Sequence, residues 1–146
     1  MTLLQAFPPA EAARTLVLAG GAAVLFSSVL GFVMLVPLQP WGKALRAWLP
    51  HKALGPAHLD WIMLGLMLGL AAAVVLLTET SAPGWWVMLM VAGAWLNPLP
   101  YAFRIFGVNA FVLAGPIHQK AAATLGLMSS AALVAGWTWL LLAAGR

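Results

Sequence analysis

Residues 16–36 read LVLAGGAAVLFSSVLGFVMLV, a run with no charged side chain. A transmembrane helix needs about 20 mainly apolar residues, because each residue advances about 1.5 Å across a hydrocarbon core of about 30 Å. The run reaches that length, and it is too long for the apolar core of a signal peptide, which spans about 7–15 residues. The stretch therefore predicts a membrane-spanning helix.

Three further stretches have a similar length and composition. A backbone in lipid must satisfy its own hydrogen bonds, so each stretch is expected to be a helix. We predict an all-α integral membrane protein in which residues 1–146 form one domain, an antiparallel bundle of four transmembrane helices. The helices are expected at about 16–36, 58–78, 85–106 and 121–144.

The composition supports a membrane protein and excludes several soluble classes. Hydrophobic residues make up 64% of the 146 residues and charged residues 7%, whereas a soluble domain carries about 25% charged residues. The pI near 10.4 is basic, but seven Lys or Arg residues spread over the chain cannot form a phosphate-binding patch. We therefore expect no nucleic-acid partner, and the lack of cysteine excludes a disulfide scaffold.

The basic residues predict the orientation of the chain. Most of them border the two longer loops: Lys43, Arg46, Lys52, Arg104 and Lys120. Cytoplasmic loops carry the excess of Lys and Arg, so both loops are expected in the cytoplasm and both termini outside, in a bacterial inner membrane. Two aromatic belts are expected, from Trp41, Trp48 and Trp61 at the cytoplasmic border and from Trp85, Trp86, Trp137 and Trp139 at the other.

His58 is one of few polar residues at membrane depth, where such groups are costly and therefore informative. It is expected to open the second helix, and Gly65 and Gly69 fall within about 20° of it on the helix wheel. Such glycines let another backbone approach closely, so His58 is a candidate haem ligand at a helix–helix or subunit interface. The alternative is an interfacial histidine that faces headgroups and water. His118, in a loop, is expected to be solvated.

Asn97, Tyr101 and Arg104 have the i, i+4 and i+7 spacing of one helical face. Pro98 and Pro100 remove backbone donors, so this end of the third helix should kink or unwind. Freed carbonyls are tolerated at membrane depth only where they line a cavity or meet protein. The pattern predicts a polar pocket near the cytoplasmic surface, with Arg104 at its mouth. The alternative is a structural kink satisfied by Asn97, with the other two residues as interface anchors.

The same polar residues disfavour several classes of membrane protein. A small multidrug exporter needs a carboxylate in mid-membrane, whereas Asp60 and Glu79 lie near predicted helix boundaries. A cytochrome with two histidine ligands needs paired histidines at depth, and only His58 comes close. The lack of a clear repeat between the halves disfavours an inverted-repeat transporter. The sequence has no Ser-His-Asp set, zinc spacing or phosphate loop.

Two groups of residues resemble the bacterial styrene oxide isomerases. They are Ala57-His58 followed by Gly65, and Gly93-Ala94-Trp95-Leu96-Asn97 followed by Tyr101. The overall pattern is also similar: a small basic membrane protein with four helices, a histidine at the start of the second and Asn-x-x-x-Tyr at the end of the third. The likeness covers most of the chain in hydropathy and few residues in identity.

The resemblance implies a trimeric membrane enzyme that binds haem b between neighbouring subunits. In that family ferric iron acts as a Lewis acid on an epoxide oxygen, the C–O bond opens, and a 1,2-hydride shift gives an aldehyde without net redox change. The resemblance implies that His58 is the axial haem ligand, that Tyr101 orients a small apolar epoxide, and that Asn97 shapes the pocket. We add the expectation that Arg104 reaches a haem propionate.

One residue departs from the family pattern. The family has an asparagine six residues after the axial histidine, where this chain has Leu64. Leucine cannot donate a hydrogen bond, so this difference leaves the identity of the substrate open. It affects the expected haem binding less than the expected substrate. Asp60 lies one turn before Leu64 on the same face and is the candidate substitute.

Three hypotheses follow from the sequence. The first is a haem b-dependent membrane isomerase that converts a small apolar epoxide to an aldehyde or ketone. The second is a non-enzymatic haem-binding membrane protein of the same fold, such as a sensor, carrier or electron-transfer subunit. The third is a structural or assembly subunit without a cofactor, in which His58 only faces the membrane interface.

Overall fold

The computed structural model describes residues 5–47 and 51–146, without the side chains of residues 47 and 51–53. The elements are, in chain order, β1 (Ala6–Phe7), α1 (Pro9–Leu35), η1 (Val36–Leu38), η2 (Pro40–Ala47), α2 (His51–Leu77), β2 (Ala82–Pro83), α3 (Gly84–Leu96), α4 (Leu99–Phe103), η3 (Arg104–Phe106) and α5 (Ile117–Ala144). The two short strands pair antiparallel, so they tie the segment before α1 to the turn between α2 and α3.

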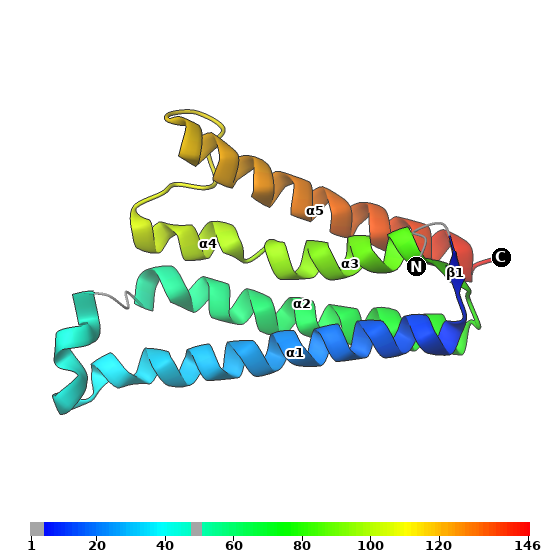
Figure 1. Ribbon diagram of the computed structural model, residues 1–146, viewed down its shortest axis with the longest axis horizontal. Coiled ribbons are helices and arrows are strands. Elements are labelled where there is room, and N and C mark those ends of the chain that lie inside the picture. Colours follow the sequence, from blue (N-terminus) through cyan, green and yellow to red (C-terminus); the bar gives the residue numbers. More distant parts are fainter. Residues whose placement is uncertain (1–4, 48–50) are drawn as a thin grey trace.

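The long helices lie side by side and alternate in direction (Figure 1). α1 packs along α2, and α5 packs on α3 and α4. β1 and the C-terminal end of α5 lie at one end of the bundle, whereas the connections from α1 to α2 and from α4 to α5 lie at the other. Within the described residues, four helical segments are long and apolar enough to cross a membrane. This confirms the predicted all-helical fold and the predicted number of candidate spans.

Several helices begin earlier than the apolar pattern predicts. α1 begins at Pro9 rather than at residue 16, and α2 begins at His51 rather than at residue 58. Proline suits the first position of α1, because its fixed φ matches the helix and no intrahelical donor is lost there. The prediction that His58 opens α2 is therefore wrong, since His58 lies inside the helix, after Pro56.

The third predicted helix is interrupted where its prolines predict a kink. α3 ends at Leu96 and α4 begins at Leu99, with Asn97 and Pro98 in a turn between them. The prolines lack the N–H that a continuous helix would donate to the preceding turn. Arg104 lies beyond α4, in η3, so the three polar residues of this region do not share one continuous helix as predicted.

Two glycines let α1 and α2 approach closely. A Cβ on Gly20 would lie 2.5 Å from the Gly65 carbonyl oxygen, and a Cβ on Gly65 would lie 2.7 Å from the Gly20 carbonyl oxygen. Neither position therefore accepts a side chain unless a helix moves. The predicted glycine groove is confirmed at Gly65, whereas a Cβ on Gly69 would have nothing within 4 Å.

Tryptophan contributes to the core at positions where the sequence predicts aromatic belts. Trp86 is fully buried and donates its indole N–H to the Gly136 carbonyl oxygen at 2.7 Å. Trp61 is also buried, and its N–H reaches the Trp95 carbonyl oxygen at 3.3 Å. The belt prediction is wrong for Trp86 and Trp61, because an indole whose N–H finds a carbonyl can be buried. Trp48 lies outside the described residues.

Candidate functional site

His58 is held against α1 by hydrogen bonds at one ring nitrogen. Its Nδ1 lies 2.8 Å from the Ser27 carbonyl oxygen and 2.7 Å from the Ser27 Oγ. The Ser27 hydroxyl donates in turn to the His58 carbonyl oxygen at 2.5 Å. Ser27 is fully buried, so these bonds are shielded and hold the imidazole on the α1 side of α2.

These partners determine the tautomer of His58. A carbonyl oxygen is only an acceptor, and the Ser27 hydroxyl proton is used by the His58 carbonyl, so Nδ1 must carry the ring proton. The lone pair of the neutral imidazole is then at Nε2, which has no hydrogen-bond partner in the part of the chain that the structure describes. Metal-ligating histidines commonly donate one ring N–H to a carbonyl and present the other nitrogen.

Gly31 leaves space beside the ring of His58. A Cβ at this position would lie 2.9 Å from Cε1 and 3.4 Å from Nε2 of the imidazole. Any other residue would press on the ring edge that includes the unprotonated nitrogen. α1 thus contributes both the group that orients His58, at Ser27, and the small residue that keeps a side chain off its Nε2 edge.

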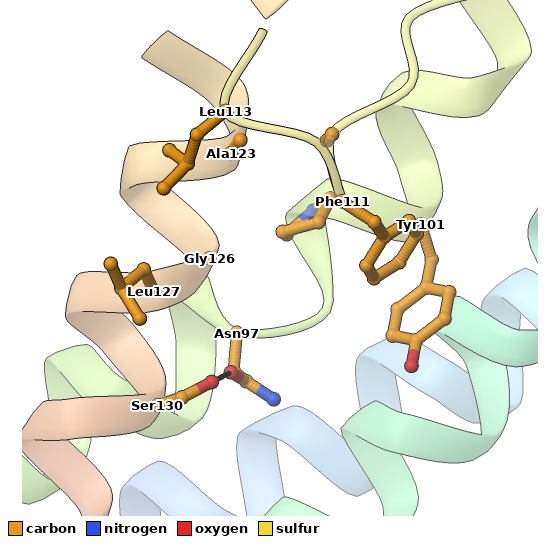
Figure 2. A pocket seen from close by; sticks show the side chains of 10 residues that line it. Asn97, Tyr101, Phe111, Leu113, Ala123, Gly126, Leu127 and Ser130 are labelled. Carbon is orange, nitrogen blue, oxygen red and sulfur yellow. Dashed lines mark hydrogen bonds between the residues drawn. The ribbon is translucent and has the colours of Figure 1, made fainter. Parts of the chain in front are cut away.

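Asn97 connects α2 and α5 at the break between α3 and α4. Its Nδ2 donates to Asp60 Oδ2 on α2 at 3.2 Å. Its Oδ1 accepts the Ser130 hydroxyl proton at 2.7 Å (Figure 2), and the Ser129 hydroxyl lies 3.2 Å from the same oxygen. The polar side chain at the kink is therefore engaged with two other helices.

A cavity of about 300 Å³ lies between the α3–α4 break and α5. It is lined by Asn97, Pro100, Tyr101, Ala110, Phe111, Leu113, Ala123, Gly126, Leu127 and Ser130. The Tyr101 and Phe111 rings are in contact, with centroids 4.8 Å apart, and Figure 2 shows the Tyr101 hydroxyl apart from Asn97 and Ser130. Asn97 and Tyr101 thus border one pocket, as predicted.

Within one chain, His58 and this cavity lie on different sides of α2. His58 faces α1, whereas Asp60 faces Asn97 and, through it, α5. His58 is not among the residues that line the cavity. Tyr101 packs against the cluster of α1 and α2 side chains that includes Ala57, the neighbour of His58. The predicted haem ligand and the predicted pocket are therefore two adjacent but separate features.

Arg104 does not lie at the mouth of the pocket that contains Asn97. It is exposed and lines a different cavity, with Gly107, Val108 and Asn109 among its neighbours. α4 ends at Phe103 and the chain continues in helical form as η3 through Phe106, which places Arg104 beside Gly107 and Asn109 rather than beside Asn97. η3, which carries Arg104, does contact α2, and the expected role toward a propionate stays a prediction.

Leu64, which stands where the resembled family has asparagine, belongs to the core. It is 5% exposed and packs in a cluster with Leu16 and Leu68, so it lines no described cavity. Asp60, the candidate substitute, uses its carboxylate to hold Asn97. Its observed role is therefore to position the kink.

Ser27 and Ser130 make two contacts that the sequence analysis missed. Most other helical hydroxyls bond to the carbonyl oxygen four residues earlier, as in Thr15, Ser28, Thr78 and Thr138. Ser27 bonds instead to His58 on α2, and Ser130 bonds to Asn97 in the turn between α3 and α4. Ser129, beside Ser130, bonds both to Asn97 and to the Gly126 carbonyl oxygen of its own helix. The available signal was the pair of adjacent serines in each of two apolar runs, but it does not tell which serine leaves its own helix.

No family model, curated protein or solved structure matches this chain. The likeness to styrene oxide isomerases stays a prediction that rests on the residues quoted for it.

Proposed function

We propose that the protein binds haem b through His58 and isomerises a small apolar epoxide in a membrane. One observation carries the proposal: Nδ1 donates to the Ser27 carbonyl oxygen at 2.8 Å, which leaves the lone pair at Nε2 without a partner among the described residues. A neutral imidazole oriented in this way can coordinate haem iron without first breaking another contact of Nε2.

The surroundings of His58 fit a haem group. Gly31 keeps a side chain off the Cε1–Nε2 edge of the ring. Phe32, which follows Gly31, and Leu59, which follows His58, are exposed. Exposed apolar side chains at these positions suit contact with an apolar macrocycle. Arg104, exposed on η3, would pair with a propionate, since guanidinium and carboxylate form strong charge-assisted hydrogen bonds.

The reaction that we propose is the opening of an epoxide to an aldehyde or ketone. When bound, ferric haem would supply a Lewis acid to the epoxide oxygen without net redox change. Tyr101 would orient that oxygen through its hydroxyl, which lies apart from the Asn97 side chain (Figure 2). Asn97 would be a positioning residue, because its bonds to Asp60 and Ser130 hold the chain just before α4. An apolar setting would limit water, which would otherwise trap the opened epoxide as a diol.

The proposal includes a second copy of the chain. His58 faces α1 and is not among the residues that line the cavity with Tyr101 in the same chain. Groups that face the open side of the haem would therefore come from a neighbouring copy, in keeping with the trimer that the resemblance implies. We propose a bacterial inner membrane, with the site near the cytoplasmic face, because the basic residues gather at that end of the helices.

A non-enzymatic haem protein is the second candidate, and the separation of His58 from the cavity favours it. In that case His58 would hold haem for sensing, carriage or electron transfer. Tyr101 would then be a packing residue against Phe111, with the ring contact as its main role.

Spectra and turnover of the purified whole chain, expressed with adequate haem, distinguish these candidates. We expect a Soret band, and we expect the ferric protein to convert an aryl epoxide to the aldehyde much faster than the reduced protein. A Soret band without conversion across a panel of aryl and alkyl epoxides would support the second candidate. Absence of the band would contradict both and favour a structural subunit.

Gly31→Ala is expected to weaken haem binding and leave the fold intact. The new Cβ would lie 2.9 Å from His58 Cε1, so the ring must shift away from its present direction. We expect haem affinity to fall about tenfold, which corresponds to about 1.4 kcal/mol, in a haem titration of the apoprotein. Gly21→Ala on the same helix is the control, since its Cβ would have nothing within 4 Å. Equal affinities of the two variants would argue against a haem beside Gly31.

A further inference from the structure

The hydrogen bonds around Asn97 all run in one direction. A carboxylate is only an acceptor, so the amide nitrogen of Asn97 faces Asp60, at 3.2 Å. The amide oxygen then faces α5 and accepts the Ser130 hydroxyl proton at 2.7 Å. The donors therefore point from Ser130 to Asn97 and from Asn97 to Asp60, and hydrogen bonds aligned in this way strengthen one another.

The direction of these hydrogen bonds determines which donors and acceptors in the cavity wall remain free to bind a ligand. The single proton of the Ser130 hydroxyl is used by Asn97, so Ser130 presents its oxygen lone pairs as an acceptor. Asn97 also lines the cavity, and its amide has a second N–H that the bond to Asp60 does not use. A ligand hydroxyl matches both groups, because it can donate to Ser130 and accept from Asn97. An ether or a ketone lacks the proton that Ser130 would accept.

The remainder of the cavity suits an apolar body. The apolar side chains that line it are Pro100, Ala110, Phe111, Leu113, Ala123 and Leu127. Its volume of about 300 Å³ is at the lower end of the range of ligand pockets. The contact between the Tyr101 and Phe111 rings gives one wall an aromatic surface. These dimensions fit a single ring or a short alkyl chain.

We propose that this cavity is a second ligand site, separate from the haem site, which binds a small apolar alcohol or phenol by its hydroxyl group. Ser130 determines the specificity, because its oxygen is the acceptor for the ligand proton. His58 does not line the cavity, so binding here does not require haem, although Tyr101 and Asn97 belong both to the cavity wall and to the proposed epoxide reaction.

Two probes that differ by one methyl group test the site: 4-fluorophenol and 4-fluoroanisole, in which the hydroxyl proton is replaced by the methyl. Binding to the whole chain in detergent is measured by ligand-observed fluorine NMR, with protein-free micelles as the background. We expect the phenol to bind about tenfold more tightly than the anisole, the effect of one hydrogen bond in a partly desolvated site. Equal affinities, or a preference for the anisole, would overturn the proposal.

Ser130→Ala is expected to remove this preference while the helical circular dichroism stays unchanged. Ser28→Ala is the matched control, because Ser28 is also an exposed helical serine and bonds only to the Val24 carbonyl oxygen of its own helix. A full preference for the phenol in Ser130→Ala would overturn the assignment of Ser130.

Leu127→Trp tests the position of the site, since Leu127 lines the cavity and is 58% exposed. The larger side chain is expected to weaken the binding of both probes severalfold, and unchanged binding would contradict a site in this cavity. His58→Ala is expected to keep the phenol preference. Failure of the haem proposal and failure of this one are therefore distinguishable.

Discussion

His58→Ala is expected to remove the Soret band from the purified protein. The substitution deletes Nε2, the proposed iron ligand, and also the Nδ1 bond to the Ser27 carbonyl oxygen. A haem without an axial ligand would be held only by apolar contacts and by the proposed pairing of Arg104 with a propionate. We therefore expect haem affinity to fall about a hundredfold or more, which corresponds to about 2.8 kcal/mol. Absorbance spectra and the haem content per chain measure the loss, and epoxide turnover should be lost with the band.

His118→Ala is the control for this experiment. His118 is exposed in the first turn of α5, so its removal should leave the spectrum unchanged. Circular dichroism should show the same helix content in both variants. A full Soret band in His58→Ala would contradict the proposal and would move the ligand to His118 or to His51, whose side chain lies outside the described part of the chain.

Gly20→Ala and Gly65→Ala are expected to destabilise the bundle strongly. Each new Cβ would lie within 2.5–2.7 Å of a backbone carbonyl oxygen on the facing helix, so α1 and α2 would have to separate. Overpacking of a close contact reduces the free energy of unfolding by about 1–3 kcal/mol. Because His58 and Ser27 belong to the same pair of helices, haem binding should weaken too. Unfolding of the purified protein by heat or by a denaturing detergent, followed by circular dichroism, measures the effect.

Gly21→Ala and Gly69→Ala are the matched controls, since a Cβ at either position would have nothing within 4 Å. Alanine is favoured over glycine inside a helix by about 0.5–1 kcal/mol, so these variants should be as stable as the natural chain or slightly more so. The change in the free energy of unfolding should thus have opposite signs for Gly20→Ala and Gly21→Ala. Similar losses at all four positions would contradict the observed packing of α1 on α2.

The arrangement of the helices could be predicted well because one physical requirement dominates it. A segment that crosses a membrane needs about 20 apolar residues, and the sequence has four such runs. The break was predictable from Pro98, since a proline cannot donate to the preceding turn. The first residues of α1 and α2, Pro9 and His51, were not predictable in this way. Hydropathy indicates which residues form the apolar part of a helix. The helix itself can continue into the polar residues on either side of that part.

The candidate site could be predicted in its residue types and not in its geometry. His58, Asn97 and Tyr101 were identified because polar groups at membrane depth are costly. The contacts of a serine outside its own helix depend on how the neighbouring segments are placed, so the bond of Ser27 to His58 and the bond of Ser130 to Asn97 could not be predicted from the serine pairs. The burial of Trp86 could not be predicted for the same reason, because its indole N–H bonds to a carbonyl oxygen on a helix distant in the sequence.

The bond between His58 and the Ser27 carbonyl joins residues 31 positions apart, both within the hairpin of α1 and α2. The cavity, by contrast, needs α5, which begins at Ile117. Chains emerge from the ribosome N-terminus first. The hairpin can therefore dock, and the imidazole can be oriented, while the last helix is still being synthesised. The proposed iron ligand would thus be oriented before the cavity of the proposed alcohol site exists, because α5 is made last.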